Sequence, residues 1–126
     1  MRAAAKILVA DDAPAVRYAL AALLRGAGYE VIEADSGAAA LRAAAAALPD
    51  LVVADLHLPG LPVGRFIAQL REACSGIRFV GLSGGGMHQD PESAVRIATA
   101  AGADRALEKP VSNATLLAEV RTALDS

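Results

Sequence analysis

Five polar residues in this chain could together bind a divalent cation and move a phosphoryl group. Three are carboxylates, at Asp11, Asp12 and Asp55, and the other two are the hydroxyl of Ser83 and the ammonium of Lys109. Carboxylate oxygens are ligands that Mg²⁺ takes in proteins. A carboxylate can also attack phosphorus to give an acyl phosphate, while an ammonium can hold phosphoryl oxygens. This chemistry requires residues that are far apart in the sequence to meet at one place.

Each of the five lies at or just beyond the end of a short apolar run, where parallel strands would bring them together. The runs that carry them are Lys6–Ala10, Leu51–Ala54, Phe79–Leu82 and the short pair Ala106-Leu107, which lies in the predicted strand Arg105–Lys109. A fifth run, Tyr29–Ala34, alternates in part between apolar and polar residues. Because Leu51–Ala54 is apolar throughout, we expect it to be buried on both faces of a sheet. In parallel sheets covered by helices, the site lies outside the carboxyl ends of the strands.

Patterns typical of helices separate these runs. The first helix is expected from Pro14 to a stop at Gly26 and Gly28, and the second from a cap at Asp35 or Ser36 to Ala47. The third should run from the end of the Leu58–Gly64 loop to about Ala73, and the fourth over Pro91–Ala101. The fifth should begin at a cap at Ser112 or Asn113. The apolar face of the first helix should consist of Val16, Leu20, Leu23, Leu24 and Ala27, and that of the last of Leu116, Leu117, Val120 and Leu124. Strands alternating with helices predict an α/β fold with a doubly wound parallel sheet.

The composition favours one globular domain and argues against several classes of protein. The length of 126 residues suits a single domain, and 55% hydrophobic with 21% charged residues argues against disorder. A formal net charge of −2 gives no electrostatic basis for direct nucleic-acid binding. The single Cys74 excludes an internal disulfide and suits a reducing compartment. No apolar stretch reaches the roughly 18 residues of a membrane span, so we expect a cytoplasmic protein without membrane insertion.

Four segments resemble, in order and spacing, the motifs of the response-regulator receiver domain, the phosphoacceptor module of bacterial two-component signalling. They are ILVADDAPAVRYALAALLRGAGYEVIEADSGAAAL, PDLVVADLHLPG, FVGLSG and AGADRALEKPVS. Each motif alone is weak, because an Asp-Asp or a Lys-Pro pair is common, but four in the right order are specific. The resemblance covers almost the whole chain. It implies a flavodoxin-like α/β fold, a five-stranded parallel sheet with strand order 2-1-3-4-5.

The resemblance also implies roles for the polar residues. Asp55 would accept a phosphoryl group from a phosphohistidine on a sensor histidine kinase or histidine phosphotransferase, or from a small phosphodonor. Asp12 and Asp55 would ligate Mg²⁺ directly, Asp11 would act mainly through water, and the backbone carbonyl of His57 would complete the protein ligands. The domain would promote its own phosphorylation and dephosphorylation without being a turnover enzyme. It would signal through altered contacts with a downstream protein.

Two further residues would serve the phosphoryl group itself. Lys109 is expected to pair with Asp55 when the site is empty and with a phosphoryl oxygen when it is loaded. Ser83 would donate a hydrogen bond to the phosphoryl group. The resemblance also predicts a cis peptide bond between Lys109 and Pro110, although only about 5–6% of X-Pro bonds are cis in general.

The other titratable residues lead to more modest expectations. Two carboxylates about 5 Å apart, as Asp11 and Asp12 would be, repel by roughly 3 kcal/mol at an effective dielectric constant of 20, so one pKa of the pair should rise. His57 and His88 lack a His or Cys partner at metal-ligand spacing and should be exposed loop residues. The His57 side chain, two places after the acceptor, is expected to tune dephosphorylation. Cys74 should be an inert residue at a helix end.

Several positions depart from the family pattern. Ala106 stands where members usually carry an aromatic residue on the fifth strand, and that aromatic moves with the strand-four hydroxyl in the usual switch. A glycine triplet, Gly84–Gly86, predicts a mobile loop before the fourth helix. Pro62 and Val63 predict a reshaped loop after the acceptor, and Ala13 replaces a frequent third acidic residue. The structural coupling between the site and the outer face is therefore expected to differ from that of other family members.

Other functions remain open alongside a phosphoacceptor signalling module. The main alternative is a receiver fold that serves as a phosphorylation-independent protein-binding module. An aspartate-nucleophile phosphatase would use a similar set of groups, but it needs two Asp spaced two residues apart on the first strand, whereas Asp11 and Asp12 are adjacent. Because the last helix reaches the end of the sequence, residues 1–126 are expected to form a single receiver domain without an output domain. This domain would be either a stand-alone receiver that acts through protein contacts or a piece of a longer chain.

Overall fold

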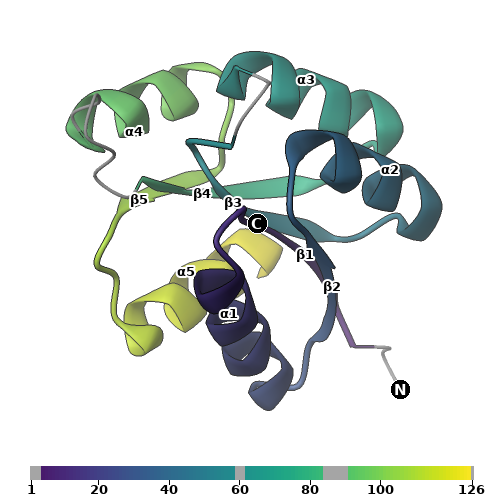
Figure 1. Ribbon diagram of the computed structural model, residues 1–126, viewed down its shortest axis with the longest axis vertical. Helices are drawn as coiled ribbons and strands as arrows, with labels where there is room; N and C mark the ends of the chain where they lie inside the picture. The colour runs from purple at the N-terminus through teal and green to yellow at the C-terminus, as the bar shows by residue number, and fades with distance from the viewer. Residues whose placement is uncertain (1–3, 59–61, 84–90, 126) are drawn as a thin grey trace.

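A parallel sheet with helices on both faces forms the protein, as seen in a computed structural model that describes residues 4–58, 62–83 and 91–125 (Figure 1). The strands are β1 (Lys6–Ala10), β2 (Glu30–Ala34), β3 (Leu51–Asp55), β4 (Arg78–Ser83) and β5 (Arg105–Glu108). Neighbouring strands are parallel, in the order β2-β1-β3-β4-β5. The predicted fold class and strand order are therefore confirmed.

The helices divide between the two faces of the sheet. One face is covered by α1 (Pro14–Gly26) and α5 (Asn113–Asp125), and the other by α2 (Gly37–Ala47), α3 (Val63–Ala73) and α4 (Pro91–Ala100) (Figure 1). The predicted strand ends and the end of α4 are correct to within one residue.

The central strand β3 shows why both faces need a cover. Val52 and Ala54 belong to the apolar cluster beneath α2 and α3, whereas Leu51 and Val53 belong to the cluster beneath α1 and α5. All four are at most 1% exposed, as the unbroken apolar run predicted. Full burial of a Val or Leu side chain contributes about 1.5–3 kcal/mol. The strand that leads into Asp55 is therefore held firmly from both sides.

Side-chain caps decide two helix starts that the sequence left open. The Ser36 hydroxyl accepts a hydrogen bond from Ala39 N at 3.1 Å at the start of α2. The Ser112 hydroxyl likewise accepts from Thr115 N at 3.1 Å at the start of α5. In both places the serine supplies an acceptor for a backbone N–H that lacks a partner within the helix.

Two expectations about the helices are wrong. Helix α3 begins at Val63, so Gly64 lies within the helix and not in the loop before it. On α1, Val16 is 36% exposed and Ala27 is also exposed, whereas Ala21 is buried. Because α1 is apolar over more than one face, the spacing of its larger residues does not define how the helix is rotated against the sheet.

Some expectations fall on parts of the chain outside the described residues. These are the Gly84–Gly86 loop, His88 and residues 59–61 of the loop after β3. Within the ranges 4–58, 62–83 and 91–125, no helix is long and apolar enough to cross a membrane.

Candidate functional site

The strand register brings the predicted site residues to one edge of the sheet. Ala10 of β1 lies opposite Ala54 of β3, so Asp11 and Asp55 both stand one step beyond the same pair. Asp55 and Ser83 are the last residues of β3 and β4, so each strand extends one residue beyond the end expected from its apolar run. The sheet itself therefore fixes the backbone of both residues.

Asp11, Asp12 and Asp55 form an acidic cluster at this edge. Each offers a carboxylate oxygen, and these three atoms lie within 4.8 Å of one another. Asp11 is buried, Asp55 is partly buried and Asp12 is exposed. The expected meeting of the three carboxylates is confirmed. Like charges this close repel, so the cluster favours a cation among its oxygens.

Asp11 is the most constrained member of the cluster. Its side chain is 1% exposed, and its Oδ1 accepts a hydrogen bond from Ala13 N at 2.9 Å. Its Oδ2 is buried without a hydrogen-bond partner among the described residues. Burial raises the pKa of the Asp11 carboxyl, the Ala13 N–H and Lys109 oppose that rise, and the neighbouring carboxylates add to it. The raised pKa was expected, but burial is a larger cause than repulsion between carboxylates.

Lys109 lies between two of the carboxylates, just beyond the end of β5. Its Nζ is 3.8 Å from Asp55 Oδ2, which agrees with the expected pair, and 3.5 Å from Asp11 Oδ2. Lys109 N also donates to Ser83 O at 2.7 Å, which ties its backbone to β4. The peptide bond between Lys109 and Pro110 is cis, as predicted. One ammonium thus faces two acids, and the cluster keeps an excess of negative charge.

Ser83 places a fully buried hydroxyl at the end of β4. The residue is 0% exposed, and its Oγ has no hydrogen-bond partner among the described residues. A buried polar group without a partner costs about 1–3 kcal/mol. The strand-end position would accept an apolar residue at lower cost, so the hydroxyl is better explained by a ligand than by packing.

His57 differs from its expected place as an exposed loop residue. Its backbone N–H donates to Asp55 Oδ1 at 2.9 Å, and the residue is partly buried. Its Nε2 is buried without a hydrogen-bond partner in the described parts of the chain. The sequence shows the position of His57 after Asp55 but not the turn that folds it back against the site.

The cluster has the donor chemistry of a Mg²⁺ site. Mg²⁺ prefers oxygen ligands and is commonly bound by one or two carboxylates, with water and phosphate oxygens completing its shell. Three carboxylate oxygens within 4.8 Å of one another meet that preference, and the buried Oδ2 of Asp11 has no hydrogen-bond partner among the described residues. The exposed side chain of Asp12 leaves the cluster open to solvent on one side.

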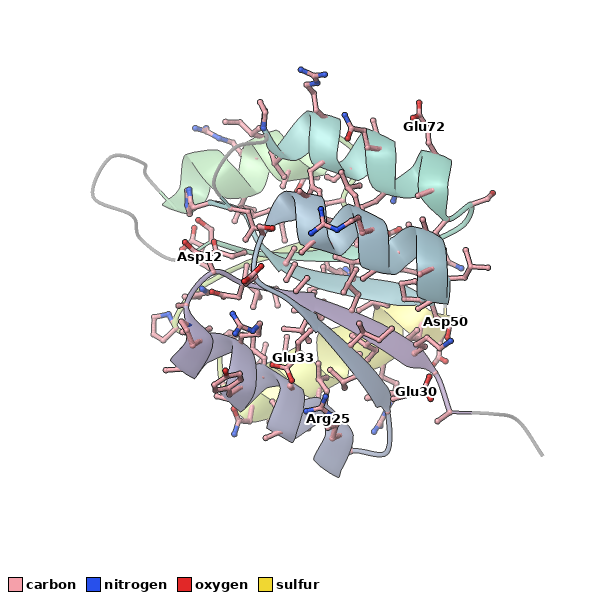
Figure 2. All side chains as sticks on the ribbon, turned by 45° about the vertical axis from the view of Figure 1, so that its right-hand side comes forward. Asp12, Arg25, Glu30, Glu33, Asp50 and Glu72 are labelled. Atoms are coloured by element: carbon pink, nitrogen blue, oxygen red, sulfur yellow. The ribbon has the colours of Figure 1, made fainter. Side chains whose placement is uncertain are left out.

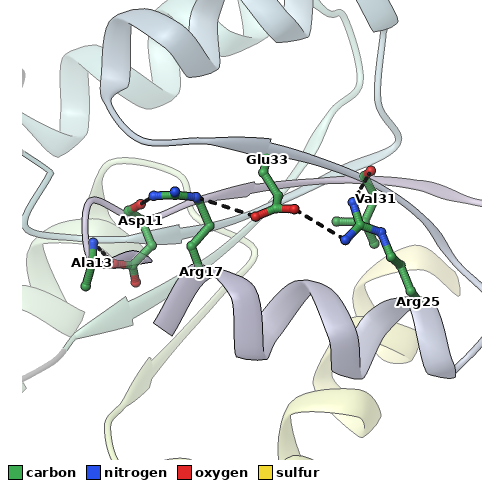
Figure 3. A network of polar contacts seen from close by, with 6 residues as sticks. All are labelled: Asp11, Ala13, Arg17, Arg25, Val31 and Glu33. Atoms are coloured by element: carbon green, nitrogen blue, oxygen red, sulfur yellow. Dashed lines mark hydrogen bonds and ion pairs between the residues drawn. The ribbon is translucent and has the colours of Figure 1, made fainter. Parts of the chain in front are cut away.

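A basic residue that the sequence did not single out also contacts this cluster. Arg17 of α1 donates from Nη1 to the backbone carbonyl of Asp11 at 3.0 Å and pairs through Nε with Glu33 of β2 (Figure 3). Its side chain is 12% exposed. On the sequence Arg17 is an ordinary polar residue beside an apolar helix face, and only the packing of α1 on β2 reveals the contact.

Small residues line the β4–β5 side of the edge. Ala106 of β5 lies opposite Gly81 of β4 in the strand register. A Cβ placed on Gly81 would lie 2.5 Å from Leu56 Cδ2, so the Leu56 side chain occupies the space above this glycine. The residue directly after Asp55 therefore packs next to the position where the family pattern has an aromatic.

Cys74 agrees with its expected place at a helix end. It follows α3, is buried, and its Sγ donates a hydrogen bond to Pro49 O at 3.3 Å. Burial raises the pKa of the Cys74 thiol, which keeps it in the protonated, unreactive form at neutral pH.

Comparison with known proteins identifies the family to which these features belong. Residues 7–121 match the response regulator receiver domain. The chain is 35% identical over 119 residues to the DNA-binding response regulator MtrA of Mycolicibacterium smegmatis, which covers 94% of this chain and 50% of MtrA. The chain therefore spans about half the length of this curated relative.

Two solved structures extend the comparison to three dimensions. Chemotaxis protein CheY4 of Vibrio cholerae matches with a TM-score of 0.82 and 29% identity, over 96% of this chain and 99% of that one. A response regulator from Burkholderia pseudomallei matches with a TM-score of 0.81 and 29% identity, over 96% of this chain and 69% of that one. The latter was crystallised with a phosphorylated aspartic acid, a calcium ion and citrate.

Proposed function

The chain belongs to the response-regulator receiver family, and on that premise we propose that it accepts a phosphoryl group on Asp55 in a Mg²⁺-dependent reaction. The observation that supports this most directly is the carboxyl edge of the sheet. There Asp55 stands within one acidic cluster, beside an ammonium that pairs with it. The orphaned hydroxyl of Ser83 lies at the end of the adjacent strand.

The donor is a phosphohistidine on a sensor histidine kinase or histidine phosphotransferase, or a small phosphodonor such as acetyl phosphate. An oxygen of Asp55 attacks phosphorus, an O–P bond forms, and the bond from phosphorus to the donor breaks. Asp55 suits this role because β3 holds its backbone and the His57 N–H orients its Oδ1. The product is an aspartyl phosphate.

Lys109 and Ser83 would receive the oxygens of the incoming phosphoryl group. Lys109 already lies within 4 Å of Asp11 and Asp55, so its ammonium can turn to a phosphoryl oxygen without leaving the site. The Ser83 hydroxyl would donate to another phosphoryl oxygen and thereby gain the partner that it lacks. Such donors act best where burial lowers the local dielectric constant.

The acidic cluster would hold the cation. Asp11, Asp12 and Asp55 would bind Mg²⁺ together with the backbone carbonyl of His57, and the bound ion would offset the charge of the carboxylates and the phosphoryl group. The buried Oδ2 of Asp11 and the pair of carboxylates at Asp12 and Asp55 support this assignment.

Mass spectrometry of the intact protein tests the proposal. After incubation with acetyl phosphate and Mg²⁺, the wild-type chain should gain the mass of one phosphoryl group, and Asp55→Asn should gain none. Asp35→Asn is a matched control, because Asp35 follows β2 at the same end of the sheet but is not in the acidic cluster. Absence of a mass gain in the wild type, or an unchanged gain in Asp55→Asn, would refute the assignment.

The signal would leave the domain through altered protein–protein contacts, with no direct contact to nucleic acid and without turnover of a substrate. We place the domain over residues 1–126 and its action in the cytoplasm. The downstream protein would contact the outer surface that the helices and loops form, so phosphorylation must change that surface.

A phosphorylation-independent binding module is the second candidate, and the β4–β5 region favours it. Ala106 and Gly81 leave this region without the aromatic that usually couples the site to the outer face, and Leu56 occupies part of the space. Amide chemical shifts with and without beryllofluoride separate the two functions. Changes that reach α4 and β5 support the signalling module, whereas changes confined to the acidic edge support the binding module.

A further inference from the structure

We propose that Arg17 is a positioning residue for the metal site, because it holds the peptide that joins Asp11 to Asp12. This inference rests on the proposed Mg²⁺ site and adds a residue to it. Arg17 touches no carboxylate of the cluster in any contact that the structure shows. It acts on the backbone instead, from the first turns of α1.

The guanidinium of Arg17 is anchored on two sides. Nη1 donates to Asp11 O at 3.0 Å, and Nε lies 3.5 Å from Glu33 Oε1 (Figure 3). The other oxygen of Glu33 lies 3.3 Å from Arg25 Nη1, and Arg25 Nη2 donates to Val31 O at 3.3 Å. This chain of contacts links the loop after β1 to the backbone of β2 through two arginines and one carboxylate.

The carbonyl oxygen is the remaining hydrogen-bonding group on the Asp11 backbone. Asp11 N donates to Ala34 O at 3.1 Å, and Asp11 Oδ1 accepts from Ala13 N at 2.9 Å. Because the peptide group is planar, holding the Asp11 carbonyl also sets the direction in which the chain enters Asp12. Arg17 therefore adds a restraint on the orientation of this peptide that the other two hydrogen bonds do not supply.

Asp12 is the residue that needs this help. Its side chain is exposed, and across residues 4–58, 62–83 and 91–125 no hydrogen bond or ion pair holds it, although its oxygen lies within the acidic cluster. An unrestrained carboxylate loses side-chain entropy when it binds a cation. Ordering the backbone at Asp12 would cost further entropy, and a peptide that is already fixed avoids that part of the cost, so Arg17 should strengthen cation binding through position.

The charge of Arg17 would have the opposite effect on the same equilibrium. A guanidinium near a cation site opposes binding of the cation by Coulomb repulsion, so its removal should tighten binding if charge alone mattered. Glu33 offsets that charge at 3.5 Å. Positioning and charge therefore predict changes of opposite sign in Mg²⁺ affinity, which makes the proposal testable.

Isothermal titration of the unphosphorylated protein with MgCl₂ measures that affinity directly. We expect Arg17→Gln to bind Mg²⁺ about tenfold or more weakly than the wild type, the range found for residues that orient metal ligands. Arg17→Lys keeps the charge but has no planar fork to reach Asp11 O and Glu33 together, so it should also bind more weakly. Arg71→Gln, which removes an arginine paired with Asp104 away from the cluster, should bind as the wild type does.

The rate of phosphorylation by acetyl phosphate gives a second readout. In both Arg17 variants the Mg²⁺ concentration for half-maximal rate should rise, while the rate at saturating Mg²⁺ returns towards that of the wild type. A loss of stability alone would not move the half-maximal concentration of the folded protein.

Each outcome bears on the proposal. Unchanged or tighter Mg²⁺ binding in Arg17→Gln overturns it, and if that variant does not fold, wild-type affinity in Arg17→Lys overturns it. Failure of the wild type to bind Mg²⁺ overturns the metal site as well. If Asp12→Ala weakens Mg²⁺ binding but neither Arg17 variant does, this inference is wrong and the proposed function is unaffected.

Discussion

Acidic residues at both ends of the sheet accept hydrogen bonds from backbone N–H groups, but those at the carboxyl end also form a cluster of three carboxylates. Figure 2 shows Asp12 at one end of the strands and Asp50 at the other. At the amino end, Asp50 Oδ2 accepts from Lys6 N at 2.8 Å. Asp104 Oδ2 accepts from Phe79 N at 2.8 Å and pairs with Arg71 at 3.1 Å. These carboxylates each satisfy a strand N–H and stabilise the sheet.

At the carboxyl end the acids are grouped with one another. Asp11, Asp12 and Asp55 lie within 4.8 Å, and the buried Oδ2 of Asp11 and Oγ of Ser83 have no hydrogen-bond partner among the described residues. A fold selected for stability alone would not keep such groups, because each is costly to bury. The difference teaches that the pairing of polar groups, more than their number, distinguishes a binding edge from a structural one.

Removal of the single ammonium at the carboxyl edge should have the largest effect. Lys109→Ala should slow phosphoryl incorporation from acetyl phosphate by about a hundredfold, because a donor to the transferred group is lost. Lys6→Ala is the matched control, since Lys6 pairs with Glu30 at 3.7 Å at the amino end. Time courses of intact mass measure both rates. Equal rates in the two variants would contradict the division between the two ends.

Removal of a paired acid from the amino end should affect stability and not phosphorylation. Asp104→Ala leaves the Phe79 N–H without its acceptor and Arg71 without its partner, which should lower the free energy of unfolding by about 1.5–3 kcal/mol. Urea denaturation measures the loss. Glu72→Ala, at an exposed acid on α3, serves as the control and should change little. Slower phosphorylation of folded Asp104→Ala would contradict the purely structural role of the acids at the amino end.

Removal of the Ser83 hydroxyl should slow phosphorylation without lowering stability. Ser83→Ala deletes a buried hydroxyl that has no hydrogen-bond partner in the described parts of the chain, so the free energy of unfolding should stay the same or rise by up to about 1 kcal/mol. Phosphoryl incorporation should nevertheless become slower, because the proposed donor is gone. The same denaturation and mass measurements apply. A clear loss of stability would show that the hydroxyl has a structural partner after all.

The buried acid at the carboxyl edge should make stability depend on pH. Because burial raises the pKa of Asp11 in the folded state, the folded protein binds that proton more tightly than the unfolded chain does. Without divalent cations, this contribution to stability is complete below the unfolded pKa and is lost as pH rises through the folded pKa. Asp11→Asn should lack this loss in thermal unfolding from acidic to neutral pH with a chelator. Parallel curves for the two proteins would contradict the prediction.

Much of the fold and part of the site could be predicted from residue types and spacing. The apolar runs and the cap-forming residues at 35–36 and 112–113 are local features, so the strands and the approximate helix starts could be predicted from the chain itself. Asp55 and Lys109 could be identified because each ends an apolar run. Parallel strands must bring such ends to one edge, whichever helices cover the sheet.

Other features depend on how distant elements pack. The rotation of α1 buries Ala21 and exposes Val16, and the same rotation carries Arg17 to the carbonyl of Asp11. The space above Gly81 is filled by Leu56 from a neighbouring strand end. No local pattern encodes these contacts, because they need two elements in a defined register.

The sequence alone thus determined the order of strands and helices and the acids that end the strands, because backbone preferences and apolar periodicity act over a few residues. Tertiary structure decided which of those acids is buried, which strand end buries a hydroxyl and which arginine contacts the carbonyl of Asp11. Burial and pairing are properties of groups brought together from separate strands and helices, and they exist only once the sheet is assembled.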